Sequence, residues 1–205
     1  MENMDTSSSN NHSNEQLEDS GKNAVLLYLR DFVSWLVGIL LVFLLLFRVI
    51  VVSGPSMNQT LVNGDYLLLI NNILYTQPKQ GGVVVAAKES FKNGEPIIKR
   101  VIATEGQWVD IDFETGIVYV NGNALDEPYV NTPTNLYEGV EFPLMVEEGC
   151  IFVMGDNRNE SKDSRSPEIG LIDQREILGK AIFLFLPGKD PVTEKMNFER
   201  IGAVS

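Results

Sequence analysis

Hydrophobic residues are distributed unevenly along the 205-residue chain. Up to about Lys22 the sequence is rich in Ser, Asn and acidic residues, which is typical of a disordered tail. From Phe32 to Phe47 there is no charge, and apolar residues continue on both sides. A stretch of about 20 residues that is apolar all round is typical of a membrane-spanning helix, whereas a core helix is apolar along one stripe. The pattern predicts a polar tail at 1–23 and a transmembrane anchor at 24–50.

The apolar segment fits a retained anchor better than a cleavable signal peptide. It is longer than the ~7–15 residues of a signal-peptide core, and no Ala-x-Ala site follows it. Arg30 and Arg48 are long enough to extend toward the two membrane interfaces. Lys22 and Arg30 precede the uncharged core and Arg48 follows it, which gives a slight bias toward a cytoplasmic N-terminus. We therefore expect a single-pass protein of the cell membrane with its downstream domain outside the cell.

After the anchor, the pattern changes to short runs of β-branched and aromatic residues separated by turn residues, as in a β-rich domain. The predicted strands are 66–70, 83–86, 97–102, 108–111, 117–120, 151–154 and 181–185. Asn121-Gly122, between apolar residues, predicts a two-residue hairpin turn. The segment 175–178 is compatible with either a short helix or a strand. The pattern thus predicts one mostly-β domain at 51–205.

Charge and cysteine content exclude several functions. The formal net charge is −12, whereas phosphate binding needs clustered Lys and Arg, so no nucleic acid is expected as a partner. The single cysteine, Cys150, rules out an internal disulfide. It begins a β-branched run, which favours a buried structural thiol over a catalytic one.

The only histidine, His12, lies ahead of the apolar segment. The downstream domain therefore has no imidazole for a Ser-His-Asp triad or a Cys-His pair. Zinc hydrolases nearly always use His ligands, so neither a metal nor another cofactor is expected. If the domain is a hydrolase, its general base is a Lys, Asp or Glu.

The first candidate for chemistry lies just past the anchor. Gly54-Pro55 forces a tight local backbone, which can present the side chain and amide of Ser56 outward. A serine placed in this way can act as a nucleophile, with its own N–H helping to hold a developing oxyanion. On this segment alone, an ordinary turn with a capping serine is the simpler interpretation.

The second candidate is Lys99. Side chains alternate along a strand, so Lys99 shares a face with Ile97 and Val101, while Arg100 points to the opposite face. Burial on an apolar face disfavours the ammonium and lowers the pKa of a lysine, and a neutral amine is the base that a serine nucleophile needs. An inward lysine that protects an edge strand from aggregation is an equally good explanation of this segment alone.

The third candidate is the segment 154–166, which is dense in Asp, Asn, Arg and Ser directly after a hydrophobic strand. Solvated loops of this composition are common. Their side chains can also brace a site through hydrogen bonds and ion pairs.

Taken in this order, the segments resemble the type I signal peptidases, the Ser-Lys endopeptidases of bacterial membranes. The resemblance rests on the N-terminal span, Ser56-Met57, Lys99-Arg100 and the run from Gly155 to Arg165, and it covers nearly all the chain from the anchor onward. It implies a catalytic domain of antiparallel sheets, partly barrel-like. A small hairpin insert is expected at about 112–149, and its shortness is similar to that of the compact Gram-positive forms.

The resemblance also implies roles for individual residues. Ser56 matches the nucleophile, Lys99 the general base, and Ser161 the serine whose hydroxyl orients the lysine amine. Asp163 and Arg165 match a supporting pair behind the site. The structural positions near the site are Met57, Gly155, Asp156, Asn157 and Arg158. The Ser56 amide would be one oxyanion donor, and Gly54 occupies the position where some members carry a serine hydroxyl as the second donor.

The implied reaction is acyl transfer, in which the signal peptides of exported preproteins are cut after small residues at positions −1 and −3. The implied partners are these preproteins and the lipid bilayer, with a secretion translocon as a further candidate. Two departures from the family pattern are Gln59 and Glu105, each where a proline is usual. They leave open a catalytically weakened binding or scaffold homologue. A Ser-Lys maturase for pili or another secretion route is a second alternative.

Overall fold

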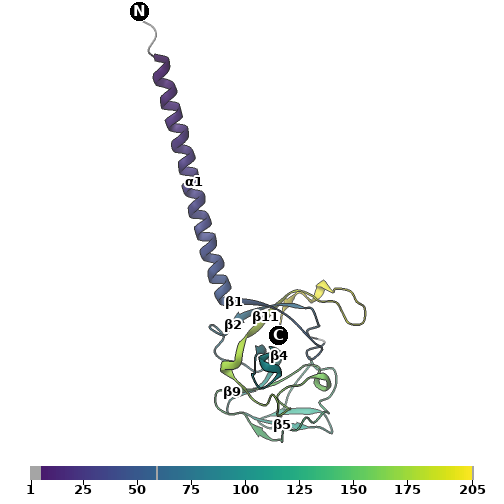
Figure 1. Ribbon diagram of the computed structural model, residues 1–205. Helices are drawn as coiled ribbons and strands as arrows, with labels where there is room; N and C mark the ends of the chain where they lie inside the picture. Colours follow the sequence, from purple (N-terminus) through teal and green to yellow (C-terminus); the bar gives the residue numbers. More distant parts are fainter. Residues whose placement is uncertain (1–5, 59, 205) are drawn as a thin grey trace, which may run out of the picture. The chain divides into compact units, whose positions relative to one another are not determined.

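The computed structural model describes residues 6–58 and 60–204 (Figure 1). The chain divides into two compact units, Met1–Leu45 and Leu46–Ser205. The first contains helix α1 (Thr6–Leu46), of which Val25–Leu46 is long and apolar enough to cross a membrane. The second contains the β-strands. An apolar N-terminal helix followed by a mostly antiparallel β domain confirms the predicted fold class.

Both ends of α1 differ from the predicted limits of the tail and the anchor. The helix begins at Thr6, inside the segment expected to be a disordered tail. A polar helix without tertiary packing is only marginally stable in water, so the disorder of residues 1–23 in solution stays a prediction. Met1 to Asp5 lie outside the described residues. At the other end, residues 47–50, expected in the anchor, form strand β1 (Phe47–Val51), which pairs with β2 (Tyr66–Asn71). Apolar β-branched residues suit a strand as well as a lipid-facing helix.

An eight-stranded antiparallel sheet forms the larger part of the domain. Its order is β1-β2-β11-β3-β4-β9-β10, and β12 pairs with β11. The remaining strands are β3 (Val83–Ala86), β4 (Ile97–Thr104), β9 (Cys150–Met154), β10 (Ile172–Asp173), β11 (Ile177–Leu186) and β12 (Gly202–Ala203). Register shifts in β4 and β11 bend the sheet into a curled half-barrel. Every strand predicted on this sheet lies within a strand of the structure.

A second sheet of four strands has the order β7-β6-β5-β8. It consists of β5 (Trp108–Asp112), β6 (Ile117–Val120), β7 (Asn123–Ala124) and β8 (Leu144–Met145). Asn121 and Gly122 both have positive φ, 52° and 77°, and join β6 to β7. This is the geometry of the two-residue turn that the Asn-Gly pair predicts. The predicted hairpin insert is therefore part of a separate small sheet that already begins at Trp108.

Short 3₁₀ helices complete the fold. They are η1 (Lys92–Gly94), η2 (Arg158–Glu160), η3 (Gln174–Glu176) and η4 (Phe198–Arg200). The segment 175–178, for which helix and strand were both open, contains the end of η3 and the start of β11. Cys150 is half-buried at the start of β9, and burial raises the pKa of its thiol. A raised pKa keeps the thiol protonated, as expected of a structural cysteine.

Glu105 and Gly106 form the turn between β4 and β5. Gly106 has a φ of 76°, and the Glu105 carboxylate accepts a hydrogen bond of 2.8 Å from the Gly149 N–H. A proline at 105 would fix φ but could not accept this bond. The side chain of Glu105 therefore ties the turn to the segment that precedes β9. The other departure, Gln59, lies outside the described residues.

Candidate active site

Ser56 and Lys99 come together at one end of a cleft. Lys99 Nζ donates a hydrogen bond of 2.8 Å to Ser56 Oγ. Strand β4 supplies Lys99, which lies opposite Val84 of β3, and the loop that follows β1 supplies Ser56. The strand alternation that predicts an inward Lys99 thus delivers its amine to the serine hydroxyl. This distance is short enough for direct proton transfer between the two groups.

Lys99 is buried, with 4% of its surface exposed. Burial lowers the pKa of its ammonium from 10.5 to about 8, and the nearby Asp163 carboxylate opposes this shift. Among the described residues, no carboxylate lies within ion-pair distance of Lys99. A sizeable fraction of the amine is therefore neutral near physiological pH, as a general base requires.

Several backbone contacts fix the loop that carries Ser56. Gly54 has a φ of 90°, a conformation that favours glycine, and its N–H donates to Asn63 Oδ1 at 3.1 Å. The Ser56 carbonyl accepts a hydrogen bond of 3.0 Å from the Asn157 N–H. Met57, the next side chain, is 1% exposed and belongs to the core of the large sheet. Core packing on one side and Asn157 on the other therefore hold the serine between them.

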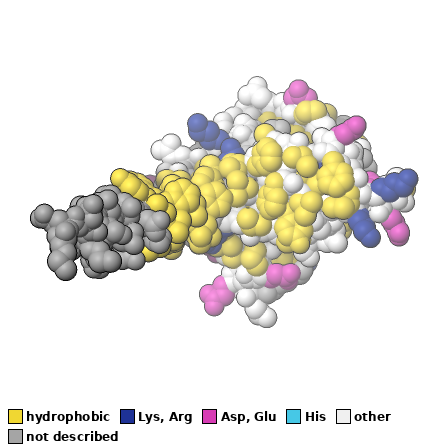
Figure 2. All heavy atoms as spheres, turned by 90° about the horizontal axis from the view of Figure 1, so that it is seen from above, with side chains coloured by type: hydrophobic (Ala, Val, Ile, Leu, Met, Phe, Trp, Pro, Cys, Tyr) yellow, Lys and Arg dark blue, Asp and Glu magenta, His cyan; other side chains and the backbone are white. Residues whose placement is uncertain are grey.

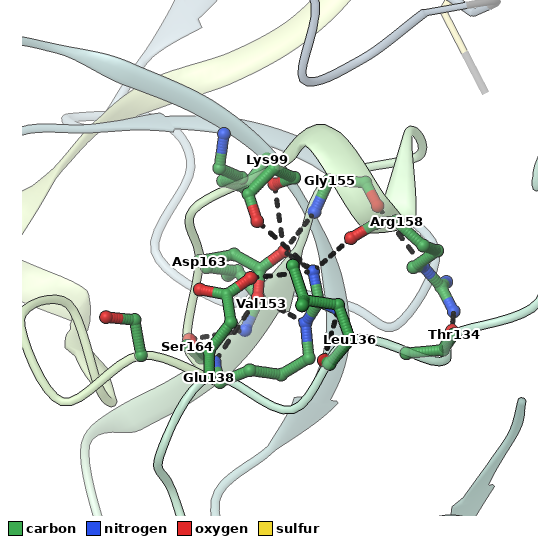
Figure 3. A network of polar contacts seen from close by, with 12 residues as sticks. Lys99, Thr134, Leu136, Glu138, Val153, Gly155, Arg158, Asp163 and Ser164 are labelled. Atoms are coloured by element: carbon green, nitrogen blue, oxygen red, sulfur yellow. Dashed lines mark hydrogen bonds and ion pairs between the residues drawn. The ribbon is translucent and has the colours of Figure 1, made fainter. Parts of the chain in front are cut away.

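Ser161, Asp163 and Arg165 form a buried network next to the dyad (Figure 3). Ser161 Oγ donates to Asp163 Oδ2 at 2.8 Å, and the Gly155 N–H donates to the same oxygen at 3.0 Å. Arg165 binds both oxygens of Asp163 at 2.8 Å. The structure thus brings Ser161 and the supporting pair to the site, with the Ser161 hydroxyl directed to Asp163. A hydrogen bond from Ser161 to Lys99 is not among those found for the described part of the chain.

Gly155 sets the spacing between this network and Ser56. A Cβ at position 155 would lie 2.2 Å from Ser161 Oγ and 2.4 Å from the Ser56 carbonyl oxygen. Both distances are far below van der Waals contact, so the close approach of Ser161 to the Ser56 backbone requires glycine here.

Arg100, expected on the face opposite Lys99, lies there but is buried as well, at 1% exposure. Its guanidinium binds Asp156 through two hydrogen bonds of 2.8 and 2.7 Å and lies 3.9 Å from the centre of the Tyr129 ring. Asp156 also accepts a hydrogen bond of 2.6 Å from Thr60 Oγ1. The arginine is therefore fully paired and braces the strand that carries Lys99.

Arg158 is the second braced cation of this region. It donates to the Gly155 carbonyl at 3.1 Å and to Thr134 Oγ1 at 2.8 Å (Figure 3). It also forms an ion pair with Glu127. Sequence reasoning missed Thr134, Glu127 and Tyr129. They lie in the loop between β7 and β8, and no local pattern marks them.

The dyad opens into a cavity of about 760 Å³. The residues 50–57 and 95–99 form two of its walls, and Val85 and Phe91 contribute apolar surface. Glu95, Glu160, Lys162 and Glu168 supply charged groups. An extended peptide can therefore lie between two chain segments with its scissile carbonyl next to Ser56.

Comparison with known proteins decides the family. The family described as "Signal peptidase, peptidase S26" matches residues 26–186. A curated relative, signal peptidase I of Bacillus licheniformis, is 33% identical over 180 residues, which cover 84% of this chain and 95% of the relative. This chain belongs to the S26 signal peptidases.

A second curated relative agrees with this assignment. Signal peptidase IB of Staphylococcus aureus is 32% identical over 182 residues, covering 77% of this chain and 91% of the relative. A crystal structure of a signal peptidase I from Enterococcus faecalis matches with 30% identity and a TM-score of 0.42, and it covers 51% of this chain and 96% of the other. The family match and the two curated relatives confirm the resemblance seen in the sequence, and the chain is a serine endopeptidase that cleaves signal peptides from preproteins.

Proposed function

We propose that this signal peptidase cleaves by acyl transfer, with Ser56 as the nucleophile and Lys99 as the general base. The observation that carries the proposal is the 2.8 Å hydrogen bond between Lys99 Nζ and Ser56 Oγ in a buried site. With no histidine after the anchor, a lysine with a lowered pKa is the group suited to take the serine proton.

The reaction has two halves. Neutral Lys99 takes the Ser56 proton while Oγ attacks the scissile carbonyl, and the resulting ammonium returns the proton to the leaving amine. The mature protein departs and the signal peptide remains as an ester on Ser56. Lys99 then removes a proton from water, which hydrolyses the ester, and the proton returns to Ser56 Oγ.

The Ser56 N–H is proposed as one oxyanion donor. Gly54 has no hydroxyl to serve as a second donor. Its positive φ and its hydrogen bond to Asn63 support a role in shaping the backbone that presents Ser56. Ser161, Asp163 and Arg165 are proposed as positioning residues. The direction of the Ser161 hydrogen bond supports an action through Asp163, which lies close enough to influence the Lys99 ammonium.

The substrates are proposed to carry small residues at positions −1 and −3. Two neighbouring segments, 50–54 and 95–98, line the cleft beside Ser56, and the wall residues include Val52, Val85 and Ile98. Side chains of an extended peptide alternate, so those at −1 and −3 point to the same side. Shallow apolar walls accept small apolar side chains there.

The helix Val25–Leu46 is proposed as the single membrane anchor, with a cytoplasmic N-terminus and an extracellular catalytic domain. Hydrophobic side chains also gather on the face of the domain that Figure 2 shows. Exposed apolar residues occur on three neighbouring strands, with Val49 and Val51 on β1, Tyr66 on β2, and Phe183 and Phe185 on β11. Contact of this surface with lipid would bring the cleft to the membrane, and a translocon can deliver substrates there.

The test is cleavage of a full-length preprotein with an Ala-x-Ala site by the detergent-solubilised enzyme. We expect wild type to cut after the −1 residue, and Ser56→Ala and Lys99→Ala to lose at least about 10³-fold in kcat/KM. Ser90→Ala, an exposed serine that does not line the cleft, is the matched control and should retain activity. Full activity of Ser56→Ala would refute the proposed nucleophile. An inactive wild type beside an active reference peptidase would favour a specialised maturase or a weakened homologue.

A further inference from the structure

Glu138 is a buried acid close to the dyad that the proposed mechanism does not use. It lies in the loop between β7 and β8, and 11% of its side chain is exposed. Both carboxylate oxygens are buried and have no hydrogen-bond partner among the described residues. The one ion pair found for them is with Arg165, at 3.4 Å. Burying a carboxylate costs free energy unless the charge is paired and hydrogen-bonded, and Glu138 has only the long ion pair to Arg165 to offset this cost.

The loop that carries Glu138 is fastened to Arg165 on both sides of the acid. The Val140 N–H donates to the Arg165 carbonyl at 3.0 Å, and Arg165 donates to the Leu136 carbonyl at 3.3 Å. Gly139, at a φ of 109°, packs against Pro167. Figure 3 shows Glu138 and Leu136 grouped with Asp163 and Lys99 in one polar cluster. The small sheet thus inserts a carboxylate behind the catalytic groups and holds it there.

The net charge of this cluster depends on Glu138 and Lys99. Asp163 and Arg165 form a neutral pair, which leaves the Glu138 carboxyl and the Lys99 amine as the groups whose protonation varies. If Lys99 is charged and Glu138 ionised, the cluster is neutral. If Lys99 is a free amine, an ionised Glu138 leaves one uncompensated buried negative charge. The two states of Lys99 therefore differ in how well they tolerate the Glu138 charge.

The charged groups around Glu138 shift its pKa in the directions that this charge coupling requires. Burial and the Asp163 carboxylate raise the pKa of Glu138, whereas Arg165, Lys162 and Lys99 oppose that rise. Reciprocally, the Glu138 charge raises the pKa of Lys99, as Asp163 and Asp156 do, and Arg165 lowers it. Glu138 and Ser161 line the same cavity of about 570 Å³, to which Glu168 also contributes. Glu168 is 60% exposed and paired with Lys162 at 2.8 Å, so solvent screens its charge.

We propose that Glu138 is a positioning residue whose carboxylate is coupled to the Lys99 amine across the Asp163–Arg165 pair. Its negative charge stabilises the Lys99 ammonium and so governs how readily Lys99 becomes a free base. The inference rests on the proposed role of Lys99 and adds to it a second acid that tunes the base.

The first test is the pH profile of kcat/KM for preprotein cleavage by Glu138→Gln. Removing the charge destabilises the ammonium, so the acid limb should shift to lower pH by about half a unit to one unit. Glu138→Asp, which restores the charge, should return the limb to within about 0.3 units of wild type. Glu141→Gln, an exposed acid of the same loop, is the matched control and should not shift the limb. An unshifted limb in Glu138→Gln, at any level of activity, would overturn the proposal.

A second measurement does not depend on activity or on the folding of Glu138→Gln. The ¹³Cδ resonance of Glu138 is followed against pH in the full-length wild-type enzyme, with Glu138→Asp used for its assignment. Coupling predicts a second, smaller inflection at the pH where Lys99 loses its proton, and this inflection should vanish in Lys99→Met. A single inflection in wild type would refute the coupling. Because this readout requires no turnover, it separates failure of the inference from failure of the proposed peptidase mechanism.

Discussion

Two buried cations, adjacent in sequence, lie on opposite faces of strand β4. Within the described ranges, Lys99 has one hydrogen bond, to the Ser56 hydroxyl, and burial lowers its pKa to about 8. Arg100 has two bonds to Asp156, one to the Gly81 carbonyl at 2.7 Å, and the Tyr129 ring beside it. Burial alone is therefore not what makes a cation reactive. A buried cation with a counter-charge braces the fold, and one without it can lose its proton, as the proposed role of Lys99 requires.

The choice of residue type agrees with this division. Guanidinium remains charged at every accessible pH and matches a carboxylate with two parallel bonds, whereas an ammonium loses its proton when it is desolvated. In the proposed mechanism, β4 therefore places a lysine on the face where a proton moves and an arginine on the face that holds the structure in place.

The largest effect is expected when Lys99 is replaced by arginine, the residue type found on the opposite face of β4. Lys99→Arg retains a donor near Ser56 but cannot provide a neutral base. We expect kcat/KM to fall at least about 10³-fold, as for Lys99→Ala, at every pH between 6 and 10. The measurement is preprotein cleavage by the detergent-solubilised full chain.

The matched control for this exchange is Lys79→Arg, since Lys79 is exposed and lies outside the cleft. It should cleave at the wild-type rate. An active Lys99→Arg would show that the lysine acts only as a hydrogen-bond donor, and the contrast between the two faces would then have no catalytic meaning.

A smaller effect, on the free energy of unfolding, is expected when Arg100 on the opposite face is replaced. Arg100→Met leaves Asp156 as an unpaired buried charge, which should cost about 3–5 kcal/mol of the free energy of unfolding. Chemical denaturation of the domain in detergent measures this cost. Arg175→Met, which breaks an exposed pair whose arginine side chain is 90% exposed, should change stability by less than about 1 kcal/mol. Equal losses in both variants would mean that the Arg100–Asp156 pair is not a special support.

The smallest of the three effects is the pH dependence of stability caused by Lys99. Its pKa is about 8 in the folded chain and 10.5 in the unfolded reference. Below pH 8 the cost of burying the ammonium is fully present, and it disappears as pH rises toward 10.5. Lys99→Met should therefore be more stable than wild type at pH 7, by up to about 3 kcal/mol, and lose this advantage as pH rises.

Denaturation midpoints between pH 7 and 9.5 provide the measurement, and Lys79→Met serves as the control because its lysine is already solvated. A pH-independent difference between Lys99→Met and wild type would mean that Lys99 remains charged in the folded enzyme. Lys99 and Arg100 would then differ in their hydrogen-bond partners but not in their protonation state.

Features with a short sequence range could be predicted, and features that depend on distant partners could not. The positive φ angles of Asn121 and Gly122 and the inward direction of Lys99 follow from local turn chemistry and strand alternation. The burial of Arg100 escaped prediction because β4 is covered on both faces. Its counter-ion lies 56 residues away in the chain.

The same reasoning explains two other differences. Residues 47–50 continue the apolar run of the anchor, and only their pairing with β2 distinguishes a strand from the end of a helix. Glu138 lies in a polar loop with several other acids, so its sequence gives no reason to single it out. Its position beside Arg165 arises from the docking of the small sheet against the network.

The missing side chain of Gly155 also constrains how this enzyme can be altered. The Ser56 carbonyl and the Ser161 hydroxyl occupy the volume that any Cβ would need. A side chain at position 155 is therefore tolerated only if the Ser56 backbone and the Ser161 side chain both move. Directed evolution of a new cleavage preference can vary the apolar cleft walls separately. A single substitution of Gly155, by contrast, should abolish the arrangement of Ser56 and Ser161.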